Sequence, residues 1–400
     1  MSNQIYLPRQ VDAAILGGGC AGMSLAYRLL LGGYRGSVVV LERAVDFDRE
    51  QRWCFWGPID KDITPFVSKT WSKFLVAGGS LEFVRPAGAK YYQVSAPSFL
   101  NAIREKLSTA NNFYLRMGVT VHKTTRDPAN HVWNIGTDCG DVAAKLVFDA
   151  RNLRGFTGSS DSAAPWLHQS FAGLTITTSK DVFDTDAVTL MDFRVPDGNE
   201  GAFIYVLPYS QNSALIESTL ISVDREETDE HLTRVNWYIE TKVKSSVTVH
   251  STETGIIPMT TTKFPFSTTP GRYYIGILGG AAKPSTGYAF TRIQRHTKRI
   301  AAEMIKFGRP LSYRPSSTDQ RREWIDDVFL TASAINKKFF TQTVLRMVDR
   351  LPPDLLIRFL SENDSLADDV KVMSVVGNRE LADAAATLSG RRPQTGSVGD

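Results

Sequence analysis

The feature that most constrains the fold is a set of three glycines spaced as G-x-G-x-x-G between Gly17 and Gly22. They follow the apolar run Val11 to Leu16, which has the length and composition of a buried strand. They also open a segment of helical spacing, Ala21 to Leu31, and a second apolar strand pattern, Val38 to Leu41, comes next. This order of strand, turn, helix and strand predicts a dinucleotide-binding βαβ unit.

Each glycine of this fingerprint has its own physical role. Gly17 permits the tight turn, Gly19 lets the backbone approach a pyrophosphate, and Gly22 allows the helix to pack closely on the strand. The helix N-terminus then presents unpaired N–H groups and the positive end of its dipole to the phosphates. Glu42 ends the second strand, and we expect it to accept hydrogen bonds from the adenosine ribose, which disfavours NADP. Other predicted cofactor contacts in this part of the chain are Cys20, Ala21, Arg43 and Arg52.

A second glycine-rich stretch, Gly279 to Phe290, lies far downstream beyond a strand-rich insert. This arrangement is typical of flavoprotein hydroxylases and their relatives, in which the distal stretch contacts the ribityl chain and ring, and it favours FAD over NAD. Many of those relatives carry Gly-Asp where this chain has Gly279-Gly280. The predicted FAD contacts of this stretch are Gly280, Pro284, Ser285, Thr286 and Gly287.

The periodicity predicts an α/β protein with an insert. Residues 1–165 and 254–320 are expected to form a Rossmann-like FAD-binding domain of the flavoprotein hydroxylase type. Residues 166–253, with short alternating strands, are expected to form an inserted antiparallel β-sheet that binds the substrate. Residues 321–388 are predicted to be helical, and residues 389–400, poor in apolar side chains, to be a disordered tail.

Individual elements follow from the same patterns. Strands are predicted at 142–150, 174–178, 188–195, 202–207, 214–222 and 275–278, and helices at 97–107, 291–307, 329–349 and 354–360.

Composition excludes several classes of protein. The chain is 42% hydrophobic and 22% charged, an ordinary globular balance, and its net charge of +4 is too small to argue for nucleic acid. Three scattered cysteines form neither a disulfide framework nor a zinc site, and the six histidines show no metal-ligand spacing. We therefore predict no metal and a cytoplasmic location. No stretch offers the roughly 20 apolar residues of a spanning helix.

A lone acid, Glu217, stands in an apolar strand pattern from Ala214 to Leu220. It shares one face of the strand with Leu215 and Thr219, so desolvation is expected to favour its neutral form. With an unperturbed pKa near 4.3, protonation at pH 7 costs about 3.7 kcal/mol, which a burial shift of about 3 units would offset. Glu217 is thus a candidate proton donor; the alternative is a glutamate paired with an arginine at a sheet edge.

Several segments resemble the flavin-dependent lycopene cyclases of carotenoid biosynthesis, and the similarity runs from Asp12 to about Ala385. The glycine fingerprint is shared with many other proteins. The Glu217 strand and the segments Gly255 to Thr260 and Lys283 to Phe290 are specific to that family. The segments that carry the resemblance are Arg52 to Trp56, Phe148 to Arg151, Leu190 to Arg194, the Glu217 strand, Gly255 to Thr260 and Lys283 to Phe290.

The resemblance implies an isomerase, or intramolecular lyase, that closes ionone-type rings at the ends of lycopene or a related carotenoid without net redox change. β-Carotene or γ-carotene would be the product. It also implies FAD in its reduced form, with NAD(P)H as the electron source. Two departures leave the ring type and substrate open: Ser218 stands where the family often has a second acid, and Gly57-Pro58 stand where an acid often follows the aromatic segment.

Such ring closure needs a neutral acid, a folded polyene, stabilisation of a carbocation and exclusion of water. Glu217 is the predicted acid, and Asp192 and Glu253 are expected to orient it or to take up the final proton. Reduced flavin would place negative charge beside the cation. Aromatic faces would contribute about 0.5–2 kcal/mol each. The predicted substrate-binding aromatics are Trp53, Phe55, Trp56, Tyr288 and Phe290.

A carotenoid is almost insoluble in water, so we expect peripheral association with the membrane. Lys283 to Arg314 is rich in basic residues, and Lys337 to Leu351 mixes basic residues with aromatics that look exposed. Such segments suit an anionic lipid surface. The alternative is a solvated basic face with a buried C-terminal helix.

Other functions share the same architecture. An FAD monooxygenase or an isoprenoid reductase would use the same cofactor halves, but it would consume one reduced nicotinamide per product. Ring closure on a different prenyl chain and a non-enzymatic flavin-binding or carotenoid-carrier protein are the remaining alternatives.

Overall fold

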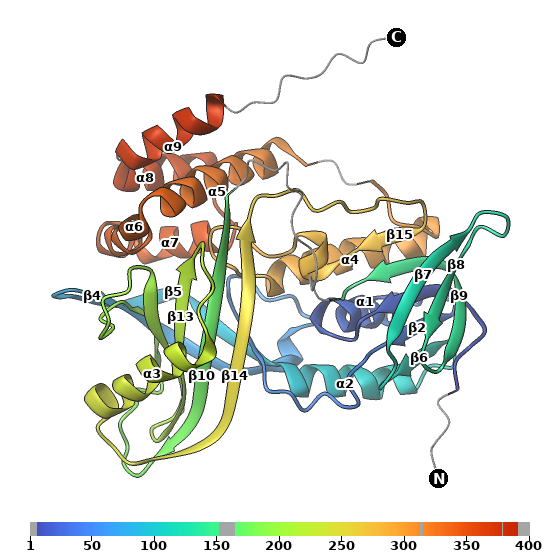
Figure 1. Cartoon of the computed structure of the whole chain (residues 1–400), viewed down its shortest axis with the longest axis horizontal. Coiled ribbons are helices and arrows are strands. Elements are labelled where there is room, and N and C mark those ends of the chain that lie inside the picture. The colour runs from blue at the N-terminus through green and yellow to red at the C-terminus, as the bar shows by residue number, and fades with distance from the viewer. Residues whose placement is uncertain (1–5, 152–164, 313–314, 378, 391–400) are drawn as a thin grey trace.

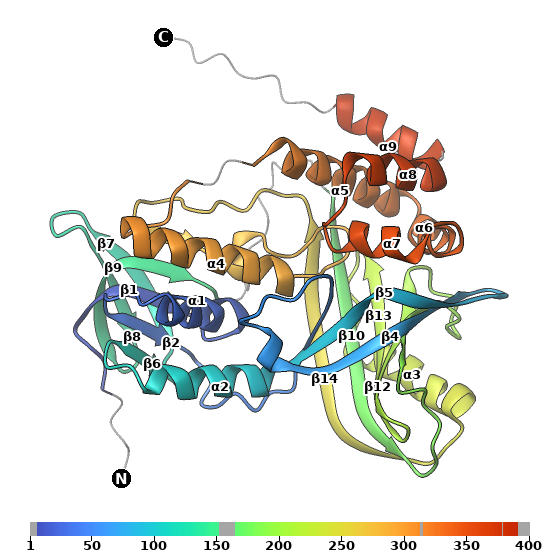
Figure 2. The ribbon, with the colours of Figure 1, turned by 180° about the vertical axis from the view of Figure 1, so that it is seen from behind.

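The computed structural model describes residues 6–151, 165–312, 315–377 and 379–390. Two β-sheets lie side by side, and helices from the C-terminal part of the chain cover the second sheet (Figures 1 and 2). This arrangement confirms the predicted α/β class with a helical C-terminal region.

The first sheet contains the βαβ unit predicted from the glycine fingerprint. Across it run β6 (Phe113–Arg116), β2 (Val38–Leu41), β1 (Gln10–Leu16), β9 (Gly140–Asp149), β8 (Val132–Thr137) and β7 (Val121–Asp127), and β15 (Arg272–Tyr274) also pairs with β9. Five of these strands run parallel to one another, namely β6, β2, β1, β9 and β15. β2 is buried along its whole length, which explains its uninterrupted apolar sequence. The helices of this domain are α1 (Cys20–Leu31), α2 (Ala96–Ser108) and α4 (Phe290–Phe307).

The second sheet has eight described strands and is larger than the sequence predicts. In order they are β14 (Val247–Thr260), β10 (Trp166–Thr178), β13 (Ser213–Ser222), β12 (Ala202–Ser210), β11 (Ala187–Asp192), β4 (Val67–Gly78), β5 (Leu81–Ser95) and β3 (Arg52–Trp56). The last three come from a segment that the sequence analysis assigned to the FAD-binding domain, because the long β4–β5 hairpin precedes the predicted insert in the chain. The domain boundaries themselves stay a prediction.

Helices cover both faces of the second sheet. One face carries α3 (Thr228–Tyr238), the single turn η2 (Ile239–Val243) and their apolar core. The other faces the C-terminal helices, as Figure 2 shows. Covered in this way, β13 is buried at every position except its two ends. These C-terminal helices are α5 (Ser317–Ile335), α6 (Lys337–Arg350), α7 (Pro353–Leu360), α8 (Leu366–Val376) and α9 (Arg379–Gly390).

Three predicted elements differ in the structure. The strand expected at 275–278 is the 3-10 turn η3 (Gly276–Gly279), entered through a left-handed Gly276, and the strand is β15 just before it. The helix expected at 329–349 is broken at Asn336, whose side chain accepts from the Lys338 amide and so begins α6. Helix α9 reaches Gly390, so the expected tail begins as helix; its residues 391–400 lie outside the described residues.

The C-terminal helices bury aromatic side chains that the sequence suggested were exposed. Phe339 and Phe340, expected to be exposed, are both buried. Phe339 packs among the C-terminal helices, and Phe340 packs against residues of the second sheet. Within the described residues, the helices are either too short or too polar to cross a bilayer. The same residues contain no cluster of three or more His, Cys, Asp or Glu side chains that could hold a metal ion.

Candidate active site

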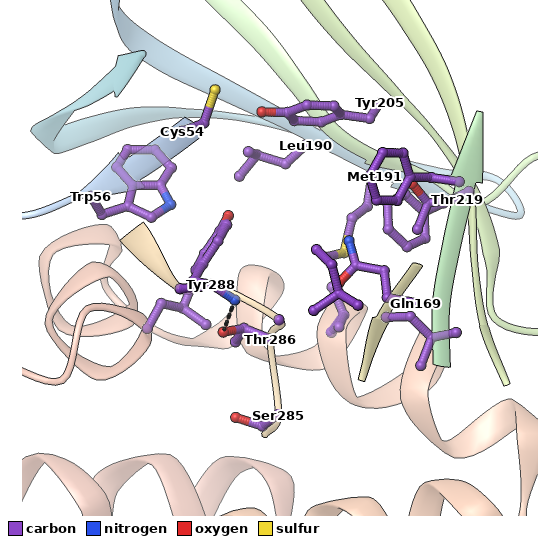
Figure 3. A pocket seen from close by; sticks show the side chains of 18 of the residues that line it. Cys54, Trp56, Gln169, Leu190, Met191, Tyr205, Thr219, Ser285, Thr286 and Tyr288 are labelled. Atoms are coloured by element: carbon purple, nitrogen blue, oxygen red, sulfur yellow. Dashed lines mark hydrogen bonds between the residues drawn. The ribbon is translucent and has the colours of Figure 1, made fainter. Parts of the chain in front are cut away.

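A cavity of about 560 Å³ lies between the second sheet, the start of α1 and the C-terminal helices. Cys20 at the fingerprint and the stretch Ser285–Phe290 line one end, and apolar residues of α8 and α9, including Val376 and Leu381, line the other. Figure 3 shows the side chains of Trp56, Tyr205 and Tyr288 converging on this space. The walls are therefore continuous from the dinucleotide fingerprint to the helical region.

The fingerprint has the geometry of a phosphate cradle. Gly17 adopts φ +100°, and a Cβ at Gly22 would lie 1.9 Å from the Gly17 carbonyl oxygen. A Cβ at Gly19 would meet no heavy atom of the described residues within 4 Å, so the space above the start of α1 is open. Gly19 is the N-cap of α1 and supplies no side-chain cap, which leaves the first amides to a ligand. These residues fit a dinucleotide pyrophosphate.

Glu42 is bound within this cradle. Its carboxylate accepts from the Gly18 amide at 2.6 Å and from the Ala44 amide at 2.8 Å, so it holds the fingerprint turn in place. The neighbouring Arg43 is exposed. The ribose contact predicted for Glu42 stays a prediction.

The distal glycine-rich stretch folds back on itself. The Gly287 amide donates to the Lys283 carbonyl, and Gly287 adopts φ +71°. Three of the predicted FAD contacts, Ser285, Thr286 and Gly287, line the cavity. Gly280 instead ends η3 and lies beside Phe264, and Pro284 is buried. Of the predicted FAD contacts in this stretch, the structure therefore brings residues 285–287 to the cavity.

Glu217 is buried in β13, with 8% of its surface exposed. Thr219 donates to its Oε1 at 3.0 Å, and the carboxyl of Glu217 is hydrogen-bonded to that of Glu253 on β14. Arg52, predicted as a cofactor contact, donates from Nη1 to Glu253 Oε2 at 2.7 Å. The structure therefore brings two of the three predicted catalytic residues, Glu217 and Glu253, together at the cavity wall. Arg52 is bound to the second of them, Glu253.

The electrostatics of this carboxyl pair separate its two members. Burial raises the pKa of Glu217 well above its usual value, and the nearby Glu253 raises it further. Burial also raises the pKa of Glu253, but the charge of Arg52 and its hydrogen bond oppose that shift. Within the pair, the guanidinium therefore favours the negative charge on Glu253 and the proton on Glu217.

The aromatic residues of β3 lie on both faces of the strand. Trp53 and Phe55 share one face, and both stack on Phe290 in the core of the first domain, with ring centroids 5.5 and 5.0 Å apart. Trp56, on the other face, packs in the core beneath the C-terminal helices, and Trp53 and Trp56 also line the cavity. Phe290 is buried in the core of the first domain and also reaches the cavity lining, and Tyr288 lines the cavity directly.

Several residues at the site were missed by the sequence analysis. The Tyr91 hydroxyl lies 3.1 Å from that of Tyr205 and 3.2 Å from that of Tyr288, and all three side chains line the cavity. Gly173 on β10 lies between the two glutamates. A glycine inside an otherwise regular strand was the signal that could have identified Gly173.

Asp192 is the predicted catalytic residue that the structure does not bring to this site. It is buried, but among the described residues it is not part of the cavity wall. Its carboxylate accepts from Arg194 at 2.8 and 2.7 Å in a two-pronged pair. Its position supports a structural role.

Residues 12–385 match the family described as Lycopene cyclase protein, which covers most of the chain. The chain belongs to the lycopene cyclase family. It is similar to the chloroplastic lycopene beta cyclase of Arabidopsis thaliana, with 24% identity over 326 residues that cover 76% of this chain and 62% of that protein. It is also similar to a lycopene beta-cyclase of Pseudescherichia vulneris, with 23% identity over 382 residues that cover 91% and 93% of the two chains. The chain thus spans less than two thirds of the Arabidopsis relative and most of the bacterial one.

Solved structures share the fold at low identity. A geranylgeranyl bacteriochlorophyll reductase-like protein from Thermoplasma acidophilum has a TM-score of 0.61 at 14% identity, covering 96% of this chain and 99% of its own. A flavoprotein/dehydrogenase from Cytophaga hutchinsonii has a TM-score of 0.62 at 14% identity, covering 95% and 99%. The flavin-dependent monooxygenase PieE, solved with FAD and substrate, has a TM-score of 0.58 at 11% identity, covering 95% and 72%. These likenesses place the chain in the flavoprotein fold.

Proposed function

We propose that this protein is a lycopene cyclase that binds FAD and closes an ionone-type ring on lycopene or a related acyclic carotenoid. The observation that carries the proposal is a buried Glu217, its pKa raised by burial and by Glu253, at the wall of an apolar cavity that begins at the dinucleotide fingerprint. A neutral carboxylic acid facing an apolar cavity is suited to protonating an alkene, and membership of the family supports this substrate class.

The chain's own residues account for the proton in both directions. The Glu217 O–H bond breaks as a C–H bond forms at the terminal double bond, which leaves a tertiary carbocation on the substrate. The neighbouring double bond attacks the cation and closes the ring. A C–H bond beside the new cation then breaks, its electron pair becomes the ring double bond, and the proton returns to the Glu217–Glu253 pair. The product is an isomer of the substrate, and the pair is restored.

Other residues keep the cation from side reactions. The apolar walls exclude water that would trap it as an alcohol. Trp56 and Tyr288 present aromatic faces to the cavity, each contributing about 0.5–2 kcal/mol to a nearby cation. Arg52 stays bound to Glu253, so its positive charge is neutralised rather than opposing the cation.

FAD fits the residues present: the amides at the start of α1 would hold its pyrophosphate, and Ser285–Gly287 would contact its ribityl chain and ring. When bound in its reduced form, the flavin supplies electron density beside the developing cation and is not consumed. NAD(P)H is the proposed source of its electrons.

Access to a carotenoid implies contact with a lipid surface, and we propose peripheral association with the membrane. We expect the basic helix α4 to attract an anionic lipid surface only weakly, because several of its cations are paired with acids. Lys298 pairs with Asp60, and Arg299 pairs with Glu303. Co-sedimentation with anionic and with neutral liposomes tests the proposal, and absence of binding to both would contradict it.

Anaerobic incubation with lycopene, reduced FAD and liposomes tests the reaction itself. The product should have the mass of lycopene and the absorption spectrum of a cyclised carotenoid, with flavin needed only in catalytic amount. A product with two added hydrogens would indicate a reductase. A parallel incubation in air with NAD(P)H tests for a monooxygenase, whose product would carry an added oxygen. Bound carotenoid without any product would indicate a carrier.

A further inference from the structure

We propose that Gly173 is the positioning residue of the carboxyl pair, and that its missing side chain is what lets Glu217 and Glu253 meet across β10. The inference rests on the proposed function in that it concerns the same acid, but its geometry is independent of any substrate.

The first observation is the strand register. In the antiparallel pairing of β10 with β13, Gly173 stands opposite Glu217, and in its pairing with β14 it stands opposite Glu253. Residues opposite one another in adjacent strands project to the same face of the sheet. The three positions therefore form one row, with the glutamates at the ends and the glycine between them.

The distance to be bridged explains why the middle position matters. Neighbouring strands lie about 4.7–4.9 Å apart, so the backbones that carry the two glutamates are separated by about 9–10 Å. The two carboxyls can be hydrogen-bonded only if both side chains lean inward over β10. The surface over which they lean is the α-carbon of Gly173.

The second observation is how little room a side chain would have. A Cβ at Gly173 would lie 2.9 Å from Glu217 Cβ, 3.1 Å from the Ile216 carbonyl oxygen and 3.1 Å from Leu215 Cδ1. The Ile216 oxygen is a backbone atom, and Glu217 Cβ is bonded directly to the backbone. Neither atom can therefore move aside unless β13 moves. An added methyl group would push Glu217 away from β10 and hence from Glu253. Glycine weakens a strand and often marks a close approach, which fits this position.

The charged and titratable groups around Glu217 are held by other elements. Glu253 comes from β14, Arg52 and Cys54 from β3, and Tyr205 is its register partner on β12. On the far side of Arg52, Glu50 Oε2 lies 3.2 Å from Arg52 Nη2. Substituting Gly173 changes none of these groups, so its effect on the acid would come through distance alone.

The test is Gly173→Ala, with Gly136→Ala on β8 as the matched control. Gly136 is also inside a strand, but its added Cβ would have only ordinary contacts, the nearest at 3.6 Å. Infrared titration of the resting protein follows the band of a protonated carboxyl that is absent in Glu217→Gln. Steady-state assays with lycopene give kcat and KM.

In Gly173→Ala the titration midpoint of Glu217 should fall, because the nearby charge of Glu253 and the hydrogen bond to it both raise the pKa of Glu217. We expect kcat to fall about 10²-fold, as for a misplacement of about 1 Å, with KM unchanged. Gly136→Ala should match the wild type in both. A wild-type midpoint and kcat in folded Gly173→Ala would overturn the proposal.

Two further outcomes separate this proposal from the proposed function. If the wild type forms no cyclised product but the Gly173→Ala midpoint still falls, the cyclase assignment fails and the role of Gly173 stands. If Gly173→Ala does not fold, the double variant Gly173→Ala with Glu217→Gly removes the Cβ that the methyl group meets. It should fold, although less stably than Glu217→Gly alone because the contact with the Ile216 carbonyl oxygen remains. A double variant that is still unfolded would contradict the proposal.

Discussion

Two buried glutamates show how the same side chain acquires different charge states in two places. Glu217 on β13 and Glu362 after α7 each expose 8% of their surface. Arg292 lies 3.0 Å from the Glu362 carboxylate and Lys283 lies 4.0 Å from it, while Arg295 also binds it. These cations lower the pKa of Glu362 to about 2 against its burial, whereas burial and Glu253 raise the pKa of Glu217.

The comparison teaches that burial does not decide the role of an acid; the nearby charges do. Glu362 connects the C-terminal helices to α4 and to the distal stretch, where Lys283 also binds Asp326 of α5 at 3.0 Å. Glu362 is thus an ionised anchor, meaning that its ion pairs hold the C-terminal helices against α4 and the distal stretch. Glu217 is instead hydrogen-bonded to another carboxyl, that of Glu253, and we propose it as the proton donor.

The largest expected effect is the loss of turnover in Glu217→Gln. The amide can still accept from Thr219 but has no proton to give, so activity should fall by about 10²–10⁴-fold. Flavin absorbance and binding should match the wild type. Folded Glu362→Gln is the comparison, and it should keep its activity. Equal turnover losses in the two variants would erase the distinction between donor and anchor.

Stability should respond in the reverse order. Glu362→Gln leaves Lys283, Arg292 and Arg295 underpaired, so the free energy of unfolding should fall by about 2–3 kcal/mol at neutral pH. The pKa of Glu362 is lowered from 4.5 to about 2, so its contribution is present above about 4.5 and lost as pH falls toward 2. Denaturation curves of wild type and variant should therefore converge in acid. Curves that stay separated below pH 2 would contradict an ionised anchor.

Glu217→Gln should stabilise the protein at neutral pH. The pKa of Glu217 is higher folded than unfolded, so the wild type loses stability as pH rises above about 4.5, by about 1.4 kcal/mol for each unit of difference. The variant avoids that loss, and the two should coincide below about pH 4. Thermal melts across this pH range measure the difference. A variant less stable than wild type at pH 7 would mean that Glu217 is ionised there.

A smaller effect is expected at Arg52. Arg52→Met removes the cation that holds negative charge on Glu253, so the pKa of Glu253 should rise and the pair should bind two protons. Proton return to the pair would then be impaired, and we expect kcat to fall about 10-fold. The pH dependence of kcat reports the change, with Lys298→Met, an exposed ion pair remote from the cavity, as a control.

The smallest effect is expected at Asp192. Asp192→Asn retains the shape of a side chain bound by Arg194 away from the cavity, so kcat and KM should stay at wild-type values while the melting temperature falls. A large loss of kcat without loss of stability would show that Asp192 acts in the reaction.

Local patterns predicted much of this fold. The fingerprint unit from β1 to β2 matches its prediction within one residue at each end, because glycine spacing and apolar runs are local signals. The contribution of β3, β4 and β5 to the second sheet was not predicted, since strand pairing between distant segments leaves no mark in either segment. The same holds for Asn336, which ends one helix and begins the next.

The candidate site divides in the same way. Glu217 was recognisable as an acid in an apolar strand, and its resemblance to a family strand added to that signal. Its contact with Glu253 depends on the register of β10 with β14, which includes a shift between Thr175 and Ile176. A slip of one residue would turn Glu253 to the other face, and no composition or spacing rule fixes that choice.

Turnover in heavy water measures the central claim, that a protonated Glu217 starts a ring closure without net redox change. The protein is equilibrated in D₂O and incubated anaerobically with lycopene, catalytic reduced FAD and liposomes, with Glu217→Gln in parallel. The account predicts a cyclised product that carries one deuterium in place of one hydrogen for each ring, and none from the variant. A product free of deuterium, or the same labelled product from Glu217→Gln, would contradict it.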